Sequence, residues 1–592
     1  MFLRKTERRK NGKAHLYWSV VESRRLDSGR VVQRHVLYLG EINSSQAEAW
    51  RKAIEVFDES AGAPRSLSLF PDERCDLPAD DASLVRLRLS QMRLCRPRQW
   101  GACWLAGVLW RELQLDRFWA ERLPRSRKGT RWDDVLQVLA TYRLLAPGSE
   151  WRLHRQWFGD SAMADLIGGD FGLAEAHKLY ACHDLLIAHK QALFSHLTQR
   201  WRDLFNASFD VLLYDLTSTY FEVNASDLPE GAKRRHGYSR DKRPDCPQLV
   251  IALVVTPEGL PLAYEVLPGN TADSKTLRSF LDRIESQYGK TRRVWVMDRG
   301  VPTEEVLAEM RASDPPVQYL VGTPKGRLTR LEKHLVDRPW RKARDGVEVK
   351  LLAQDDELYV YAQSADRLAK ERAMRRRQLK WLWARLTKLA AMDVSPKERL
   401  MKLGAARSKA PSAWRLLDVT LDENTGRLSF SLNRNKLRAA RRREGRYLLR
   451  TNLTEGDPAL LWQYYIQLVA VEEAFKNLKG DLAIRPIFHQ SERRIEAHIF
   501  VAFLAYCLQI TLTRRLHGLA PGLTARSALA KFAAVQMIDV HLPTTDGREI
   551  VLTRTTEPEP ELRLLLDRMN LTLPAQPPPK ITAAALPARS SL

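Results

Sequence analysis

Cysteine is scarce in this chain of 592 residues. The six cysteines are scattered, and no two of them form a CxxC pair. Cysteines and histidines also do not gather at the short spacings by which zinc fingers and zinc ribbons hold their metal. These absences exclude a disulfide-stabilised secreted scaffold and a zinc-finger module. We therefore expect free thiols in a reducing compartment.

Long apolar runs are also missing. The longest, residues 499–508, has about half the length that an α-helix needs to cross a bilayer. The N-terminal segment MFLRKTERRK is charged and lacks the apolar stretch of a secretory signal. We therefore expect no membrane partner and a cytoplasmic protein.

The charge balance favours one sign. Lysine and arginine number 95 against 71 acidic residues, which leaves a formal net charge of +24. Basic side chains release the counterions condensed on a nucleic acid, so a surplus of this size indicates a polyanionic partner. Nucleic acid is the first choice, and an anionic membrane surface is the weaker alternative. The apolar fraction of 44% predicts a globular chain.

The pattern along the chain predicts an α/β protein of several domains. The β-rich beginning includes a hairpin around residues 27–29 and a strand over residues 85–94, and helical spacing follows it. The predicted division is a β-rich region at 1–95, a helical region at 96–205, a core in two parts at 206–324 and 447–515, a mixed insertion at 325–446, and a C-terminal region with a Pro/Ala-rich tail at 516–592.

Two aspartates follow short apolar strands in the first part of the core. Asp215 ends a strand over residues 209–215, and Asp298 follows a strand over residues 293–297. These strands are the first and fourth of a β-β-β-α-β block, which are adjacent in a ribonuclease-H-like sheet. Each aspartate alone could simply end its strand, because aspartate is common in turns. Together they suit Mg²⁺, which prefers oxygen ligands, and the two-metal chemistry that cleaves phosphodiesters.

A third carboxylate is expected on a helix over residues 458–479. Asp457 and Pro458 mark its beginning, and Gly480 marks its end. Two neighbouring glutamates on this helix, Glu472 and Glu473, compete for the role.

The helical face decides between the two glutamates. Residues seven apart differ by only about 20° around a helix. The face of Glu472 also carries Tyr465, Lys476 and Lys479. The face of Glu473 carries Ile466, Val469 and Gly480, which bind no phosphate. We therefore choose Glu472, although an amphipathic helix with a solvated Glu/Lys face has the same spacing.

These segments resemble a known family. The motif YxxLxxVExxFxxLK, followed by RPxxH and RRIxxHIFxxFLAYxL, resembles the C-terminal signature of bacterial insertion-sequence DDE transposases of the IS-four superfamily, nearest the IS-sixteen-thirty-four branch. YDLTSTYFE and VMDRG match the family's two Asp motifs, while YLVGTP and YLLRTNL match segments that flank its insertion. The superfamily motif Y-x2-R-x3-E-x6-K places Tyr465, Glu472 and Lys479 in register, but Leu468 occupies its arginine position.

The resemblance implies a ribonuclease-H-like catalytic core interrupted by a β-strand-rich insertion. It implies that Asp215, Asp298 and Glu472 hold Mg²⁺, for which Mn²⁺ can substitute. The implied reaction is nicking at the element's ends, followed by attack of the freed 3′ hydroxyl on a phosphodiester. The implied partner is double-stranded DNA, as terminal inverted repeats bound by residues 96–205 and as target, held by a homodimer in the bacterial nucleoid. The side chains expected on DNA are Tyr465, Lys476, Lys479, Arg485 and Arg299.

Two basic clusters lie between the second Asp motif and the Glu472 helix. One, on a helix over residues 366–392 with Trp381 and Trp383, fits a DNA-backbone ridge or a solvated helix whose tryptophans pack on a sheet. The other contains Arg438 and residues 441–443, and we expect it in a DNA-facing loop or a surface turn. Beyond the helix, His489 is a candidate phosphate contact and His498 a core residue.

Two other functions are compatible with the same motifs. A structure-selective DNA nuclease could use the same sheet, but it needs neither the large insertion nor the tyrosine/lysine helix. A domesticated transposase could bind DNA without catalysis, but it does not need three carboxylates.

Overall fold

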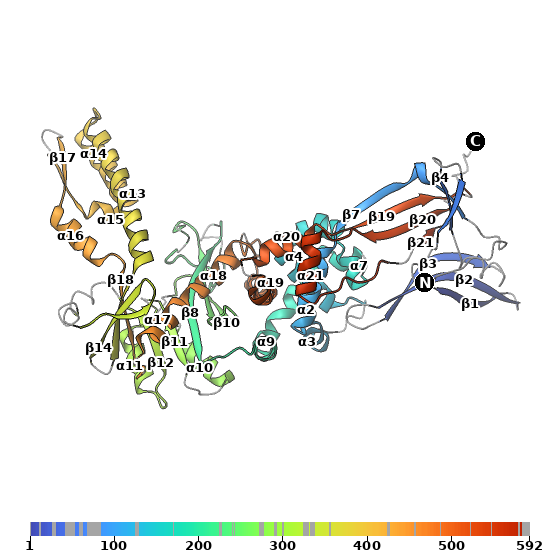
Figure 1. Cartoon of the computed structure of the whole chain (residues 1–592), viewed down its shortest axis with the longest axis horizontal. Helices are drawn as coiled ribbons and strands as arrows, with labels where there is room; N and C mark the ends of the chain where they lie inside the picture. The colour runs from blue at the N-terminus through green and yellow to red at the C-terminus, as the bar shows by residue number, and fades with distance from the viewer. Residues whose placement is uncertain are drawn as a thin grey trace.

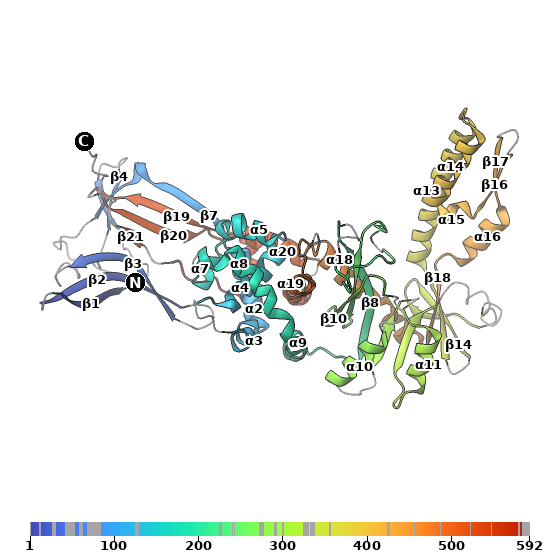
Figure 2. The same cartoon turned by 180° about the vertical axis from the view of Figure 1, so that it is seen from behind.

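The computed structural model of the chain is elongated (Figure 1, Figure 2). Strands from both ends of the sequence lie at one end, a layer of helices lies in the middle, and a large sheet with a projecting arm lies at the other end. The described residues are 2–10, 13–25, 31–41, 54–58, 63–67, 85–124, 129–169, 171–223, 228–239, 241, 243–271, 277–288, 293–298, 301–323, 331, 338–354, 357–422, 427–454, 457–485, 487–520, 522–545, 547–577 and 580–582.

Two small sheets belong to the beginning of the chain. The first contains β1 (Phe2–Lys10), β2 (Lys13–Arg25) and β3 (Val31–Glu41), all antiparallel. The β2–β3 pairing confirms the predicted hairpin, whose turn at residues 27–29 lies outside the described residues. The second sheet contains β4 (Ile54–Asp58), β5 (Ala63–Leu67) and β6 (Val85–Arg88).

The single strand predicted over residues 85–94 is wrong. β6 ends at Arg88, a 3₁₀ turn (η1, Leu89–Gln91) follows, and β7 (Arg93–Gln99) enters a different sheet. The alternation of apolar and polar residues runs across all three segments, so periodicity alone does not reveal the turn. The other strands of this sheet come from the C-terminal region. β7 pairs with β19 (Gln536–Pro543), and β20 (Glu549–Thr555) and β21 (Lys580–Thr582) follow in that order.

A buried ion pair fastens β7 to β19. Arg98, only 2% exposed, donates to both carboxylate oxygens of Asp539, at 2.8 and 3.0 Å. Asp165 lies 3.2 Å from the Arg98 Nε, and Thr553 donates to Asp539 at 2.8 Å. Burial alone would raise the pKa of Asp539, but the hydrogen bonds from Arg98 and Thr553 hold it below its ordinary value. The pair therefore joins residues 441 positions apart in the sequence.

A long apolar helix, α19 (Glu492–Leu519), lies within the helical layer. The main helices of the layer are α2 (Gly101–Glu112), α3 (Leu115–Arg122), α4 (Trp132–Leu145), α8 (Ala176–Leu186) and α9 (Lys190–Phe205). Both α4 and α8 pack directly on α19. By length and composition α19 could cross a membrane, but 94% of its most apolar window is buried inside the protein. Its apolar character therefore matches a core helix.

The largest sheet among the described residues has nine strands. Its order is β10-β9-β8-β11-β12-β18-β15-β14-β13. The strands are β8 (Val211–Tyr220), β9 (Gln248–Val255), β10 (Pro261–Pro268), β11 (Val294–Met297), β12 (Gln318–Gly322), β13 (Arg341–Arg344), β14 (Val347–Gln354), β15 (Glu357–Ser364) and β18 (Arg446–Thr451). The parallel β8–β11 pairing confirms that the first and fourth strands of the predicted block are adjacent.

The range predicted as an insertion has two parts. β13, β14 and β15 join the nine-stranded sheet through the β15–β18 ladder, and buried valines such as Val349 and Val360 extend its core. The rest projects as an arm (Figure 1). The arm contains α13 (Ala365–Ala390), α14 (Pro396–Lys409), α15 (Pro411–Trp414), β16 (Leu417–Leu421), β17 (Leu428–Leu432) and α16 (Arg434–Arg443).

The arm contains both basic clusters identified in the sequence, and its structure tests what was expected of them. Arg438 and residues 441–443 lie on the exposed helix α16, which Asn433 caps, so the predicted loop or turn is wrong. Trp383 of α13 packs edge-on against Phe430 of β17, with ring centroids 4.9 Å apart. For this tryptophan the sheet-packing alternative is therefore correct.

We expect Asp539→Ala to destabilise the protein markedly. Arg98 would stay buried without its main partner, and breaking a buried pair in this way costs about 3–5 kcal/mol. Urea unfolding followed by tryptophan fluorescence should show an earlier first transition. Asp203→Ala, which removes a surface partner of Arg200, serves as the control and should leave the transition in place. Equal shifts in the two variants would contradict the assigned role of the buried pair.

Candidate active site

Asp215 and Asp298 occupy neighbouring positions in the nine-stranded sheet. Tyr214 of β8 pairs with Met297 of β11, so the two aspartates come directly after a matched pair. Neighbouring strands are about 4.8 Å apart, and matched positions of parallel strands point to the same face. The sheet therefore brings these two carboxylates together.

One detail of the expected placement is wrong. Asp298 follows the end of β11 as predicted, but Asp215 lies in the middle of β8, which continues to Tyr220. The strand continues because β9 pairs with it from Leu213 through Tyr220, which buries the polar segment 217–219.

Two consecutive helices, α17 (Pro458–Ile466) and α18 (Leu468–Lys479), replace the single helix predicted before Gly480. Asp457 caps α17 as predicted, because its carboxylate accepts a hydrogen bond from the Ala459 N–H at 2.9 Å. The interruption is one tight turn at Gln467, whose carbonyl accepts a hydrogen bond from the Ala470 N–H at 2.8 Å. Helix α18 packs against β8, the strand of Asp215.

Asp215, Asp298 and Glu472 line one cavity of about 160 Å³. The other lining residues are Arg367, Tyr465, Ile466, Leu468, Val469 and Val471. Glu473 is not among them. Its charge adds to burial in raising the pKa of Tyr506 on α19. The structure thus places Glu472, and not Glu473, at the cavity. The predicted division of helical faces is only partly matched, because Ile466 and Val469, which were assigned to the face of Glu473, line the same cavity.

The donor set of the cavity fits a hard divalent cation. It offers three carboxylates, and none of its described lining residues is cysteine or histidine. Mg²⁺ and Mn²⁺ prefer such oxygen ligands, whereas Zn²⁺ in proteins is usually held by nitrogen and sulfur. Asp215, Asp298 and Glu472 are therefore the residues that could hold the metal.

Two cations predicted to contact DNA are held together by one carboxylate. The Lys479 Nζ donates to Asp241 Oδ1 at 3.0 Å, and an Arg485 Nη lies 2.9 Å from the other oxygen of Asp241. The Arg485 guanidinium also lies 4.9 Å from the centre of the Tyr220 ring, which belongs to β8. Lys476 is exposed. Arg299 lies outside the described residues.

The sequence places Arg367 in the basic cluster of its helix, as part of a DNA-backbone ridge or of a solvated face, and does not predict its position at the cavity. It lies in the first turn of α13, directly after β15, and its guanidinium is 4.9 Å from the centre of the Tyr447 ring. Tyr465 stacks on the same tyrosine, with ring centroids 5.7 Å apart. The only signal in the sequence was the start of a helix immediately after a sheet strand.

His489 and His498 lie apart from this cavity. Both are buried with His183 around the carboxylate of Glu150. His489 does not reach the surface, so the phosphate contact considered for it is wrong, while His498 is a core residue as predicted. Burial, reinforced by nearby Arg143, lowers the pKa of His498 to about 3. Burial opposes ionisation of Glu150, but the three histidines around its carboxylate lower its pKa.

Two family models match the chain. The model described as the transposase DDE domain matches residues 210–508, and the model described as the N-terminal domain of IS1634 family transposases matches residues 3–63. No curated protein matches. Among solved structures, the cryo-EM structure of the piggyBac transposase synaptic complex with hairpin DNA matches with a TM-score of 0.30 and 8% sequence identity, over 75% of this chain and 87% of that chain.

We expect the cavity to bind Mn²⁺, and Glu472→Gln to weaken that binding by roughly tenfold or more. Loss of a residue that only supports a metal ligand already costs about 10–100-fold, so loss of a charged ligand should cost at least as much. Electron paramagnetic resonance of free Mn²⁺ during a titration measures the affinity. Glu473→Gln, the matched neighbour, should bind as the wild type does. The reverse order of affinities would show that the wrong glutamate was chosen.

Proposed function

Because the chain belongs to the insertion-sequence DDE transposases, nearest the IS1634 family, we propose that it cleaves the ends of a DNA element and joins the freed 3′ hydroxyls to target DNA. The two family matches confirm the resemblance drawn from the sequence motifs. The observation that carries the proposed chemistry is the cavity shared by Asp215, Asp298 and Glu472.

The sheet order supports a ribonuclease-H-like catalytic core. Three antiparallel strands, β8, β9 and β10, come first, and β11 then returns beside β8 in parallel. This arrangement holds the two aspartates on a rigid frame, and α18 supplies the glutamate from outside it. Rigid elements keep catalytic groups at constant separations better than loops do.

Asp215, Asp298 and Glu472 would hold two divalent cations, which when bound supply activation of the attacking oxygen at one ion and stabilisation of the leaving oxygen at the other. The contribution of the protein's own side chains is to position the reacting groups. By fixing the positions of the cations, Asp215, Asp298 and Glu472 would determine where the scissile phosphate binds, so that water in the nicking step and the 3′ hydroxyl in the joining step meet it in line. Tyr465, at the wall of the cavity, would restrict the terminal nucleotide.

The basic side chains near the cavity would bind the phosphates that flank the cleaved bond. Lys476, Lys479 and Arg485 lie on or just after the helix of Glu472, and we assign the same role to Arg299, which follows Asp298. In the DNA-free chain Asp241 pairs with both Lys479 and Arg485 and offsets one of their two positive charges. A DNA phosphate would take the place of Asp241, because it too offers anionic oxygens to both side chains.

Arg367 is proposed to supply the guanidinium that the family motif places at Leu468. Both residues line the cavity, so an arginine from α13 reaches the region that an arginine on α18 would occupy. The layered contact of Arg367, Tyr447 and Tyr465 would keep its orientation. A planar guanidinium suits a phosphate better than a flexible ammonium does.

The proposed partners follow from the family and the charge. The net charge of +24 suits double-stranded DNA, both as terminal inverted repeats and as target. The helical region at 96–205 would bind the inverted repeats. Two copies of the chain would form the synaptic complex, in the bacterial nucleoid. The basic helices α13 and α16 of the arm would bind the DNA backbone.

The decisive test uses labelled DNA that carries the inverted repeats flanking the gene. With Mg²⁺ present, the wild-type protein and Glu473→Gln should cleave the repeat ends and join them to target DNA. Glu472→Gln should do neither, because a neutral amide is a poor ligand for a hard divalent cation. Gel analysis of both products measures the two steps separately.

The remaining outcomes distinguish the rival functions. Cleavage without joining would favour a structure-selective nuclease, and binding without either step would favour a DNA-binding protein that has lost catalysis. Activity in Glu472→Gln together with its loss in Glu473→Gln would overturn the assignment of the third carboxylate.

Arg367→Ala is expected to lower strand transfer about 10- to 100-fold at saturating DNA, since a hydrogen bond to a charged group contributes roughly 1.5–3 kcal/mol. Arg376→Ala, an exposed position on the same helix, should instead change DNA affinity and its salt dependence. Introducing Leu468→Arg into the Arg367→Ala chain should restore part of the rate. An effect of Arg367→Ala on DNA affinity alone would contradict this role.

A further inference from the structure

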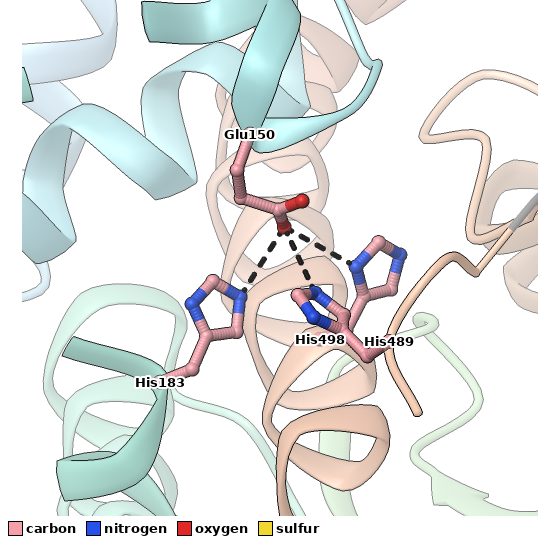
Figure 3. Close-up of side chains that lie close together, drawn as sticks. All are labelled: Glu150, His183, His489 and His498. Atoms are coloured by element: carbon pink, nitrogen blue, oxygen red, sulfur yellow. Dashed lines mark hydrogen bonds and ion pairs between the residues drawn. The ribbon is translucent and has the colours of Figure 1, made fainter. Parts of the chain in front are cut away.

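Four buried side chains from three regions of the sequence converge within the helical layer (Figure 3). Glu150 begins α5 (Glu150–Arg152), His183 lies on α8, His489 precedes α19, and His498 lies on α19. They are 4%, 0%, 6% and 2% exposed in that order, so the group is shielded from water. None of them lines the Asp215 cavity.

The three distances from Glu150 to the histidines are close to the edges of a tetrahedron around a metal ion. Glu150 Oε1 lies 3.4 Å from His183 Nε2, 3.2 Å from His489 Nε2 and 3.5 Å from His498 Nδ1. Zinc–ligand distances of about 2.0–2.2 Å give tetrahedral edges of roughly 3.3–3.6 Å. All four donor atoms also lie within 4.8 Å of one another.

Backbone carbonyls select the tautomers of two of the histidines. The carbonyl of Leu179 lies 2.9 Å from His183 Nδ1, and that of Ile484 lies 3.1 Å from His498 Nε2. These nitrogens carry the protons because the carbonyls only accept. In neutral rings the opposite nitrogens, which face Glu150, therefore present lone pairs. Metal-binding histidines are commonly oriented in this way by a second hydrogen bond.

Two hydrogen-bond acceptors face each other in this group, and a bound cation would stabilise that arrangement. The Nε2 of His183 is buried and has no hydrogen-bond partner among the described residues, yet it points at the Glu150 carboxylate, itself an acceptor (Figure 3). Two acceptors facing each other in a dry site need a proton or a metal ion between them.

Arg143 brings a positive charge nearby. It donates to the carbonyl of Ala483 at 3.1 Å, and it approaches His498 Nδ1 at 3.4 Å. Neither of these contacts satisfies His183 Nε2. When a metal ion takes the lone pair of His498, Arg143 retains the hydrogen bond to Ala483. The rival arrangement is a metal-free network in which protonated histidines pair with Glu150.

We propose that Glu150, His183, His489 and His498 bind one Zn²⁺ ion in a closed structural site. Three imidazoles and one carboxylate suit zinc, and four protein ligands leave no open position for a substrate. This site differs in donors and in place from the all-carboxylate cavity. It is independent of the proposed strand-transfer chemistry.

The proposed ion would connect two parts of the molecule. Glu150 and His183 belong to the helical layer, whereas His489 lies in the segment that leads from α18, the helix of Glu472, to α19. The Arg143 contact with Ala483 supports the same segment from α4. Zinc would therefore hold the chain that follows the catalytic helix against the helical layer.

Metal analysis of the purified full-length protein tests the proposal. We expect about one zinc per chain to remain after a chelator wash that removes loosely bound metal. Asp215→Asn should retain the zinc, because it alters only the carboxylate cavity. His183→Gln and His498→Gln should lose it. His177→Gln, an exposed histidine on the same helix as His183, is the matched control and should retain it.

Two further measurements keep the test decisive if a histidine variant fails to fold. Stripping the wild-type protein with a strong chelator should lower its melting temperature by several degrees, and added Zn²⁺ should restore it. Replacement by Co²⁺ should give the visible absorption bands of tetrahedral cobalt, which Zn²⁺ then abolishes.

Three results would overturn the proposal. The first is a wild-type protein that neither contains zinc nor takes up Zn²⁺ or Co²⁺, which would favour the network of protonated histidines. The second is a zinc content lost in Asp215→Asn but kept in His183→Gln, which would assign the ion to the carboxylate cavity. The third is an octahedral cobalt spectrum in the wild-type protein.

Discussion

The parallel pairing of β8 with β11 is the constraint on which the site depends. It sets Tyr214 beside Met297 and therefore places two carboxylates on neighbouring strands. Like charges so close together repel each other in a partly buried cavity unless a cation lies between them. The ladder of backbone hydrogen bonds and the buried apolar residues of both strands hold them there. Helix α18 completes the site because it packs on the same strand, β8.

Helix α19 links this sheet to the rest of the chain. It is buried along most of its length, packs against α4 and α8 of the helical layer, and also contacts α18. A displacement of α19 would therefore reach both the helix of Glu472 and the cluster around Glu150. Its long apolar sequence reflects this central position, since a helix surrounded by protein has no polar face to present to water.

Local patterns were sufficient for much of the site. The short apolar strand before Asp298 and the Asp457 cap depend on residues close in sequence, and the structure agrees with both. Tyr465 and Glu472 share the cavity as expected, although they lie on two helices and not on one. The length of β8 was missed because its polar residues 217–219 are buried only through pairing with β9, a distant partner. The break at Gln467 was not predicted because no glycine or proline, the usual helix-breaking residues, lies beside it.

Other features arise only when distant segments meet. β13 to β15 look like part of an insertion in the sequence, yet they extend the main sheet. Arg367 reaches the cavity because the strand before its helix joins that sheet. The group of Glu150, His183, His489 and His498 follows no short metal-ligand spacing, since its members come from three separate regions of the chain. Tertiary placement, rather than local propensity, decides each of these features.

The sheet that combines β7 with β19 ties folding to the order of synthesis. β7 is synthesised hundreds of residues before β19. Arg98 therefore cannot pair with Asp539, 441 positions later, until most of the chain has been made. Until then one edge of β7 has no strand beside it, and unpaired edges are where chains aggregate. A chain that stops before Gln536 therefore keeps an open edge and an arginine without its partner. Such a chain would be less stable and more prone to aggregate than the full-length protein.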